Sequence, residues 1–285
     1  MVFTAVNRVL WQMTMGRLRG LWVLGFLLGT PAMATAVCRT QAVEAWAGVV
    51  QSNWQEYGPT GKTLLTERGQ LLQHGLGWRG HCADWHLQLQ GTRAQGSRLY
   101  QGQTNQGMPV STTSEIEATS LDAQVWYPVS ANWSLGGRFF ERATERDLKS
   151  VGAVQGYVEN FHQSAWAVGL QHQLDTQDWG RWQTRVWHGV GRGHMHVTLP
   201  GMDAARLPLG AMRWWAAQLQ WSGCRGAEGT SRWGCDVALN YQSERLERGA
   251  TQPIYRQGLH RANAYQPSTH QQALGLNVGV QYRFD

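Results

Sequence analysis

Charged side chains are scarce in this chain. They make up 15% of its 285 residues, against roughly 25% in a typical soluble globular protein. Lysine is nearly absent, since only Lys62 and Lys149 occur and the other basic side chains are arginines. The formal net charge is +6, but no dense basic run is present. This composition is not typical of a soluble protein with a charged surface, and it gives no reason to expect nucleic acid as a partner.

Long apolar runs are also missing. The apolar stretch near the N-terminus, residues 21–28, is too short to span a bilayer as a helix. It follows Arg17 and Arg19, and the small residues Ala32, Ala34 and Ala36 provide two A-x-A cleavage sites. These features predict a cleaved secretory signal peptide over residues 1–36. The mature domain is then expected over residues 37–285.

Motifs for common cofactors are absent as well. The chain has no P-loop, no dinucleotide-binding glycine fingerprint and no HExxH sequence, and we expect no cofactor. His194 and His196 share a strand face and could bind a transition metal weakly. No set of residues predicts a dedicated metal site.

Glycine and tryptophan are abundant, with 34 and 16 residues, and several segments alternate apolar with polar residues. The clearest is 274–284; others are 85–90, 121–127, 165–171 and 232–242. A period of two predicts β-strands with one apolar face. The other face carries Gly, Gln and isolated Arg or Asp instead of the Lys, Glu and Thr of a solvated sandwich. This favours a membrane barrel with a crowded lumen over a soluble β-sandwich.

The C-terminal segment carries a resemblance. Asn277, Gly279, Tyr282 and Phe284 alternate at the end of the chain, and this pattern resembles the assembly signal of bacterial outer-membrane β-barrel proteins. It differs in that Asp285 follows the last aromatic residue. The resemblance implies localisation in the outer membrane of a Gram-negative bacterium. It also implies that the barrel-assembly machinery recognises the C-terminal strand.

The predicted fold is all-β: an antiparallel transmembrane β-barrel of about ten strands, with eight to twelve allowed. The less regular regions 44–80 and 244–271 leave this range open. The strands are expected at 45–57, 63–80, 84–99, 114–127, 132–146, 160–175, 180–198, 211–223, 231–244 and 272–284. Short periplasmic turns are expected at 80–83, 128–131, 175–179 and 222–230. Extracellular loops are expected at 101–113, 147–159, 199–210 and 242–271.

The four cysteines, Cys38, Cys82, Cys224 and Cys235, all fall at the periplasmic end of this layout. Four cysteines allow three connectivities, and the layout selects the pairs Cys38–Cys82 and Cys224–Cys235. Export to an oxidising compartment favours disulfides over a metal site, and no C-x-x-C spacing is present.

A barrel of this size has a narrow interior that side chains can largely fill. Polar and charged residues on the predicted inward face are Arg79, Gln88, Asp122, Gln124, Arg138, Arg185, Asp236 and Arg283. They could form a hydrogen-bonded, charge-paired filling that holds the shape of the barrel. They could instead line a constricted polar pathway for small solutes. The size argues against a wide, general porin.

An enzyme is the alternative hypothesis. His162 and Ser164 stand two residues apart on one predicted strand and therefore share a face. They could serve acyl transfer if an acidic side chain, such as Glu145, Asp147 or Glu159, oriented the histidine. A His-x-Ser pair resembles the site of outer-membrane lipid A deacylases, which implies a hydrolase that acts at the extracellular rim. The rest of the chain does not match those enzymes in length or context.

A third set of residues predicts contact with anions. Arg245, Arg248, Arg256 and Arg261 lie in the predicted loop 242–271, and arginine forks bind phosphates well. They could hold the phosphates of lipopolysaccharide, or they could anchor a solvated loop at the headgroup layer. The sequence therefore predicts an outer-membrane barrel with a structural, surface or small-solute transport role ahead of catalysis. Outer-membrane lipids are its expected partners.

Overall fold

The computed structural model describes residues 38–104, 107–176, 179–223 and 232–284. The predicted signal peptide, together with Cys224 and Asp285, lies outside these residues. The described residues contain no helix that is long and apolar enough to cross a membrane.

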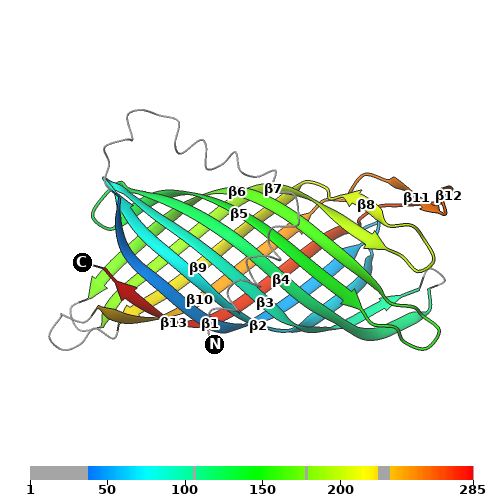
Figure 1. Ribbon diagram of the computed structural model, residues 1–285, viewed down its shortest axis with the longest axis horizontal. Helices are drawn as coiled ribbons and strands as arrows, with labels where there is room; N and C mark the ends of the chain where they lie inside the picture. The colour runs from blue at the N-terminus through cyan, green and yellow to red at the C-terminus, as the bar shows by residue number, and fades with distance from the viewer. Residues whose placement is uncertain (1–37, 105–106, 177–178, 224–231, 285) are drawn as a thin grey trace, which may run out of the picture. The chain divides into compact units, whose positions relative to one another are not determined.

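Ten antiparallel strands form a closed barrel (Figure 1). Their order is β6-β5-β4-β3-β2-β1-β13-β10-β9-β7, and pairing of β6 with β7 closes the sheet. The strands are β1 (Arg39–Tyr57), β2 (Thr63–Cys82), β3 (Trp85–Gln103), β4 (Pro109–Pro128), β5 (Trp133–Leu148), β6 (Tyr157–Thr176), β7 (Gly180–Thr198), β9 (Met212–Gly223), β10 (Trp233–Leu246) and β13 (Ser268–Arg283). The predicted fold class and strand number are confirmed.

Two of the predicted loops contain strands of their own. β8 (Ala205–Pro208) pairs with β7, while β11 (Gln252–Arg256) and β12 (Leu259–Ala264) form a hairpin. The predicted loop 242–271 is too long, because β10 continues to Leu246 and β13 begins at Ser268. The hairpin turns at Gln257 and Gly258, which both have positive φ angles. Asp203 accepts hydrogen bonds from their two backbone N–H groups, at 3.1 and 3.0 Å, and so ties the two loops together.

Burial alternates along the strands as a barrel requires. On β2, Leu71 is buried, whereas its neighbour Leu72 is 62% exposed. On β13, Val278 is 58% exposed, whereas Gln281 is buried. Exposed apolar side chains therefore cover the outer face of the strands, while many polar and charged side chains are buried in the interior, which is unlike a soluble protein.

The exposed apolar side chains form a continuous belt around the barrel, called the apolar belt below. It consists of Val43, Val49, Leu72, Leu76, Leu89, Leu121, Leu135, Trp166, Val168, Leu170, Val186, Val190, Trp215, Leu219, Val237, Leu239, Leu274, Leu276, Val278 and Val280. Exposed patches of this size mark contact with a partner or a membrane. A belt that passes over every strand fits the lipid-facing band of a transmembrane barrel.

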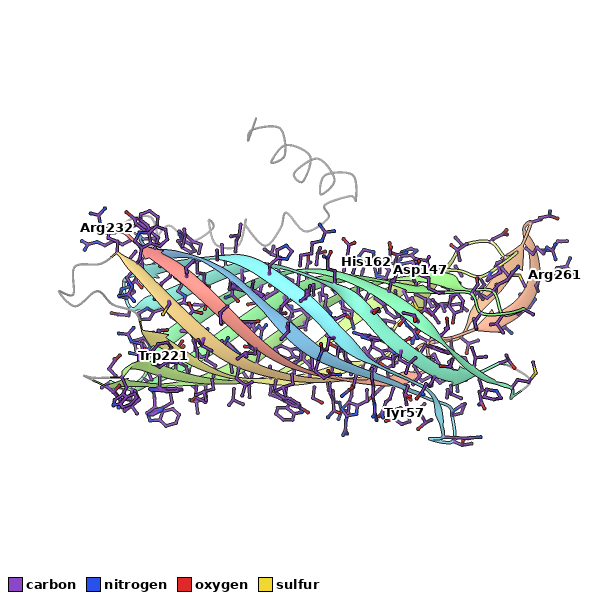
Figure 2. All side chains as sticks on the ribbon, turned by 90° about the horizontal axis from the view of Figure 1, so that it is seen from below. Tyr57, Asp147, His162, Trp221, Arg232 and Arg261 are labelled. Carbon is purple, nitrogen blue, oxygen red and sulfur yellow. The ribbon has the colours of Figure 1, made fainter. Side chains whose placement is uncertain are left out.

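Aromatic side chains mark the end of the barrel that carries the short turns. Trp85 contacts Tyr127 with ring centroids 4.9 Å apart, and Trp233 contacts Tyr282 at 5.1 Å. Figure 2 shows Trp221 near the same end. Such aromatic rings are typical of the membrane–water interface of these barrels.

The other edge of the apolar belt, toward the end of the barrel with the longer loops, can be located from the residues that pair across adjacent strands. On β5, β6 and β7 the last apolar rung joins Phe139, Trp166 and Val190, and the next outward-facing rung joins Glu141, Ser164 and Arg192. A membrane strand needs roughly 9–11 residues, whereas β2, β4 and β6 have 20 residues each. A large part of the barrel therefore extends beyond the belt, with polar side chains on its outer wall.

Candidate functional site: a filled lumen and a polar outer wall

At the end with the short turns, the lumen holds a polar network centred on Glu44. This carboxylate pairs with Arg79 at 2.5 Å and accepts hydrogen bonds from Gln90 and Gln88 at 2.9 and 3.1 Å. Arg185 donates to the amide oxygen of Gln88 at 3.0 Å. Glu44 lies on β1, Arg79 on β2, both glutamines on β3 and Arg185 on β7, so the network ties four strands together across the lumen.

A second carboxylate in the same region is Asp122 on β4. It accepts a hydrogen bond from Arg138 at 2.5 Å and another from Gln124 at 2.8 Å. The Arg138 guanidinium also lies over the ring of Trp214, 5.0 Å from its centroid. These two networks, around Glu44 and Asp122, are called the turn-end network below.

A layer of aromatic rings follows along the lumen. Trp126 and Trp187 have ring centroids 4.4 Å apart, and Phe140 and Trp214 have centroids 5.1 Å apart. All four side chains are buried, with Trp126, Trp187 and Trp214 at 1–2% exposure. Small inward residues make room for such rings: a Cβ at Gly169 would lie 2.2 Å from the Trp187 ring.

Beyond the aromatic layer lies a cluster of buried charges, called the loop-end network. Arg146 contacts Glu159 at 2.5 Å, Glu67 at 2.7 Å and Glu56 at 3.3 Å. Arg98 lies 3.7 Å from Glu67. All five side chains are buried. Buried charges need partners of opposite sign, and here two guanidinium groups and three carboxylates supply them.

The same region contains a second buried group of partners. Arg142 contacts Glu244 at 2.5 Å and donates to Gln163 at 2.7 Å, and Gln163 donates to Glu244 at 2.7 Å. An apolar cap lies around the outer ends of these strands. It includes Leu65, Leu148, Val197, Leu207, Leu209 and Ile254, all of which are buried.

The predicted lumen residues lie on the inward faces of their strands. Gln88, Asp122, Gln124, Arg185 and Asp236 are buried, and Arg79, Arg138 and Arg283 are partly buried. Sequence reasoning missed Glu44 and, in the loop-end network, Glu56, Glu67, Arg98 and Arg146, and it placed Glu159 at the outer rim instead of in the lumen. A signal was present on β5, because Arg142 and Arg146 follow Arg138 at even spacing and therefore share its face.

His162 and Ser164 point to the outer wall, not into the lumen. Neither forms a side-chain hydrogen bond with a described residue, and His162 stacks on His194 with centroids 5.1 Å apart. Glu159 cannot orient His162, because it faces the lumen and binds Arg146. His194 and His196 lie close together, with centroids 5.0 Å apart. Even so, the described residues contain no group of His, Cys, Asp or Glu arranged to hold a metal ion.

A different Ser–His contact occurs on the outer wall. The Ser243 hydroxyl and Nε2 of His270 are 3.0 Å apart. Ser243 is only 5% exposed, and none of the described carboxylates is hydrogen-bonded to His270. The pair therefore lacks the accessible nucleophile and the orienting acid of a hydrolase. It fixes the position of the His270 ring beside a groove.

The groove next to His270 has a volume of about 440 Å³. It is lined by Tyr57, Arg213, Arg245, Leu246, Glu247, Ser268, Thr269 and His270. Of the arginines predicted to contact anions, Arg245 lines this groove from β10. Arg248 lies over the ring of Tyr265 at 3.9 Å, and Arg256 and Arg261 are exposed on the hairpin. Figure 2 shows Arg261 at the far end of the hairpin.

One of the two predicted cysteine pairs is present among the described residues. Cys38 and Cys82 form a disulfide. Cys235 is also disulfide-bonded. Its expected partner, Cys224, lies outside the described residues, so the second pairing stays a prediction.

Comparison with known proteins identifies the fold. No family model and no curated protein matches this chain. Among solved structures, the outer membrane protease OmpT from Escherichia coli is similar, with a TM-score of 0.51 and 11% identity over 88% of this chain and 100% of that chain. This chain has the fold of the bacterial outer-membrane β-barrels. The translocator domain of the autotransporter NalP from Neisseria meningitidis also matches, with a TM-score of 0.44 and 11% identity over 89% and 91% of the two chains. The identity of 11% to OmpT indicates a shared fold alone.

Proposed function

We propose that this protein is a non-conducting surface or structural barrel of the bacterial outer membrane. The filled lumen carries the proposal. The turn-end network, the aromatic layer and the loop-end network follow one another along the barrel, and each is built from side chains of several strands. A transport pathway would need to break several of these contacts at once.

The polar outer wall supports a role at the cell surface. Beyond the apolar belt, the barrel presents charged and polar side chains and two loops, one of which carries the β11–β12 hairpin that Asp203 ties to the other. A protein that only anchored itself in lipid would need strands of roughly 9–11 residues. The additional length of the strands instead holds the loops well above the membrane surface.

Export and assembly follow the same proposal. The predicted signal peptide would direct the chain across the inner membrane, and the barrel-assembly machinery would recognise β13. That strand, the last of the barrel in sequence, pairs with the first strand, β1, over nearly its whole length. Every second residue from Leu274 to Tyr282 points outward and is apolar or aromatic, as the assembly signal requires.

The hydrolase alternative has less support. His162 and Ser164 share the outer wall, but no described carboxylate is bonded to the histidine, and the Ser243–His270 contact is covered. Acyl transfer needs a nucleophile that substrate can reach and a base held by a third group.

Planar-bilayer recording tests the proposal. The heat-modifiable protein, purified from the outer-membrane fraction, should insert without producing conductance steps, while an open porin in the same bilayer produces them. Reproducible steps that change in size in Arg138→Gln or Asp122→Asn would overturn the non-conducting role. They would establish the small-solute pathway instead.

A further inference from the structure

The outer wall beyond the apolar belt is divided into sectors of opposite charge. The acidic sector lies on β4 and β5 and consists of Glu115, Glu117, Glu141, Glu145 and Asp147. The basic sector lies on β7 to β13 and consists of Arg192, His194, His196, Arg206, Arg213, Arg245 and His270. Asp147 and His162 mark the acidic sector and the adjoining strand in Figure 2.

The acidic sector is partly neutralised by its neighbours. Lys149 bridges Asp147 and Glu115 at 2.6 and 2.7 Å, and Arg93 pairs with Glu117 at 2.8 Å. These contacts are exposed and require no ligand.

The basic sector has few partners of opposite charge. Arg213 and Arg245 are directly opposite each other on β9 and β10, and Arg245 is directly opposite His270 on β13. Like charges placed opposite each other on adjacent strands are destabilising. Glu247 is the carboxylate that lines this groove, and it lies 3.6 Å from Arg213 with both side chains largely exposed. The side chains of Arg213, Arg245 and His270 therefore converge on one groove, and Glu247 is the carboxylate there that offsets their charge.

The polar side chains that line the groove are also positioned to bind a ligand. The Ser243 hydroxyl fixes the His270 ring at 3.0 Å, and Arg245 forms no ion pair with any described residue. Tyr57 and Ser268 contribute further polar groups to the lining. Two guanidinium forks and an imidazole match the oxygen atoms of a phosphate group.

The level of the groove identifies the source of the phosphate. Trp215 follows the groove residue Arg213 by two positions on β9, and Leu274 follows His270 by four positions on β13; both Trp215 and Leu274 belong to the apolar belt. The groove thus begins where the belt ends, at the level of lipid headgroups. We propose that it binds a phosphate group of an outer-leaflet lipid, an inference that rests on the proposed placement in the outer membrane.

The test measures how phosphorylated lipid stabilises the barrel. Purified protein in a zwitterionic detergent is titrated with bisphosphorylated lipid A and with its dephosphorylated form, and the temperature at which the heat-modifiable band disappears is followed. The test variant is Arg213→Gln/Arg245→Gln. The matched control is Arg68→Gln/Arg93→Gln, which removes two exposed arginines of the outer wall on β2 and β3.

We expect the phosphorylated lipid to raise that temperature in the wild type and the control. In the test variant the half-maximal concentration should rise on the order of tenfold, since two charge-assisted contacts are lost. If the double variant does not fold, Arg245→Gln alone should give a smaller shift in the same direction.

Three results would overturn the inference. These are an equal response to dephosphorylated lipid, an equal loss in the two double variants, or full stabilisation by inorganic phosphate alone, which would mean a free-anion site. The bilayer recording is independent of this test. If the barrel conducts but is still stabilised by the phosphorylated lipid, the proposed non-conducting function is wrong and the phosphate site in the groove stands. If the barrel does not conduct and the phosphorylated lipid does not stabilise it, the proposed function stands and the phosphate site is wrong.

Discussion

At the scale of single residues, the most consequential feature is the charge buried in the lumen. Arg146 is the common partner of Glu56, Glu67 and Glu159, and all four side chains are buried. Removing one member of a buried ion cluster leaves the remaining charges buried without a partner. The resulting loss of stability is larger than the net stabilisation that the intact cluster provides.

Arg146→Met should therefore destabilise the barrel by about 3–5 kcal/mol. Reversible urea unfolding in detergent micelles, followed by tryptophan fluorescence, measures the change in the free energy of unfolding. The matched control is Arg93→Met. Arg93 pairs with Glu117 on the exposed outer wall, and exposed pairs contribute about 0–1 kcal/mol. Equal effects of the two substitutions would mean that water reaches Arg146 and that the lumen is open.

At the scale of strands, the apolar belt decides which positions tolerate charge. Val278 lies within the belt on β13, whereas Gln51, on the adjacent strand β1, is exposed at the edge of the belt, directly opposite Leu274. The same substitution at the two positions therefore compares a lipid-facing site with a polar one.

Val278→Arg should cost about 2–4 kcal/mol of unfolding free energy in lipid vesicles, the range for arginine near the middle of a bilayer. Gln51→Arg should change the unfolding free energy by less than about 1 kcal/mol. Equilibrium unfolding in denaturant measures both. A harmless Val278→Arg would show that the belt does not contact lipid.

The strands also show what the sequence can predict. β6 and β13 are predicted well, because within the belt one face is apolar and the other is polar or glycine. Beyond the belt both faces are polar, so the period of two disappears. The predicted strands therefore stop short there: β13 begins at Ser268 instead of 272, and β4 begins at Pro109 instead of 114.

The same limit explains the missed parts of the site. Glu67 and Arg68 are adjacent polar residues, and only their burial, 0% for the Glu67 side chain, tells which faces the lumen. The groove beyond the belt combines Arg213, Arg245 and His270 from β9, β10 and β13. Arg245 and His270 are far apart in sequence, and strand register alone brings them together.

At the scale of the whole barrel, the two ends differ in their connections. One end has the turns 83–84 and 129–132, while the other carries the 247–267 segment with its hairpin. Figure 1 shows the hairpin β11–β12 beyond the end of the barrel near β8. The usual asymmetry of outer-membrane barrels assigns short turns to the periplasm and longer loops to the cell surface.

Cysteine labelling in intact cells tests this orientation. Arg261→Cys places a thiol on the exposed hairpin, and Ser130→Cys places one in an exposed short turn. A membrane-impermeant maleimide should label Arg261→Cys in intact cells, because the hairpin faces the medium. It should label Ser130→Cys only after the outer membrane is permeabilised.

Background labelling should be low, since none of the described cysteines is free. The wild-type chain, labelled in the same way, measures that background. The reverse pattern, with Ser130→Cys labelled in intact cells, would show that the barrel has the opposite orientation in the membrane. The loop-end network and the phosphate groove would then face the periplasm, and neither the surface role nor an outer-leaflet ligand could stand.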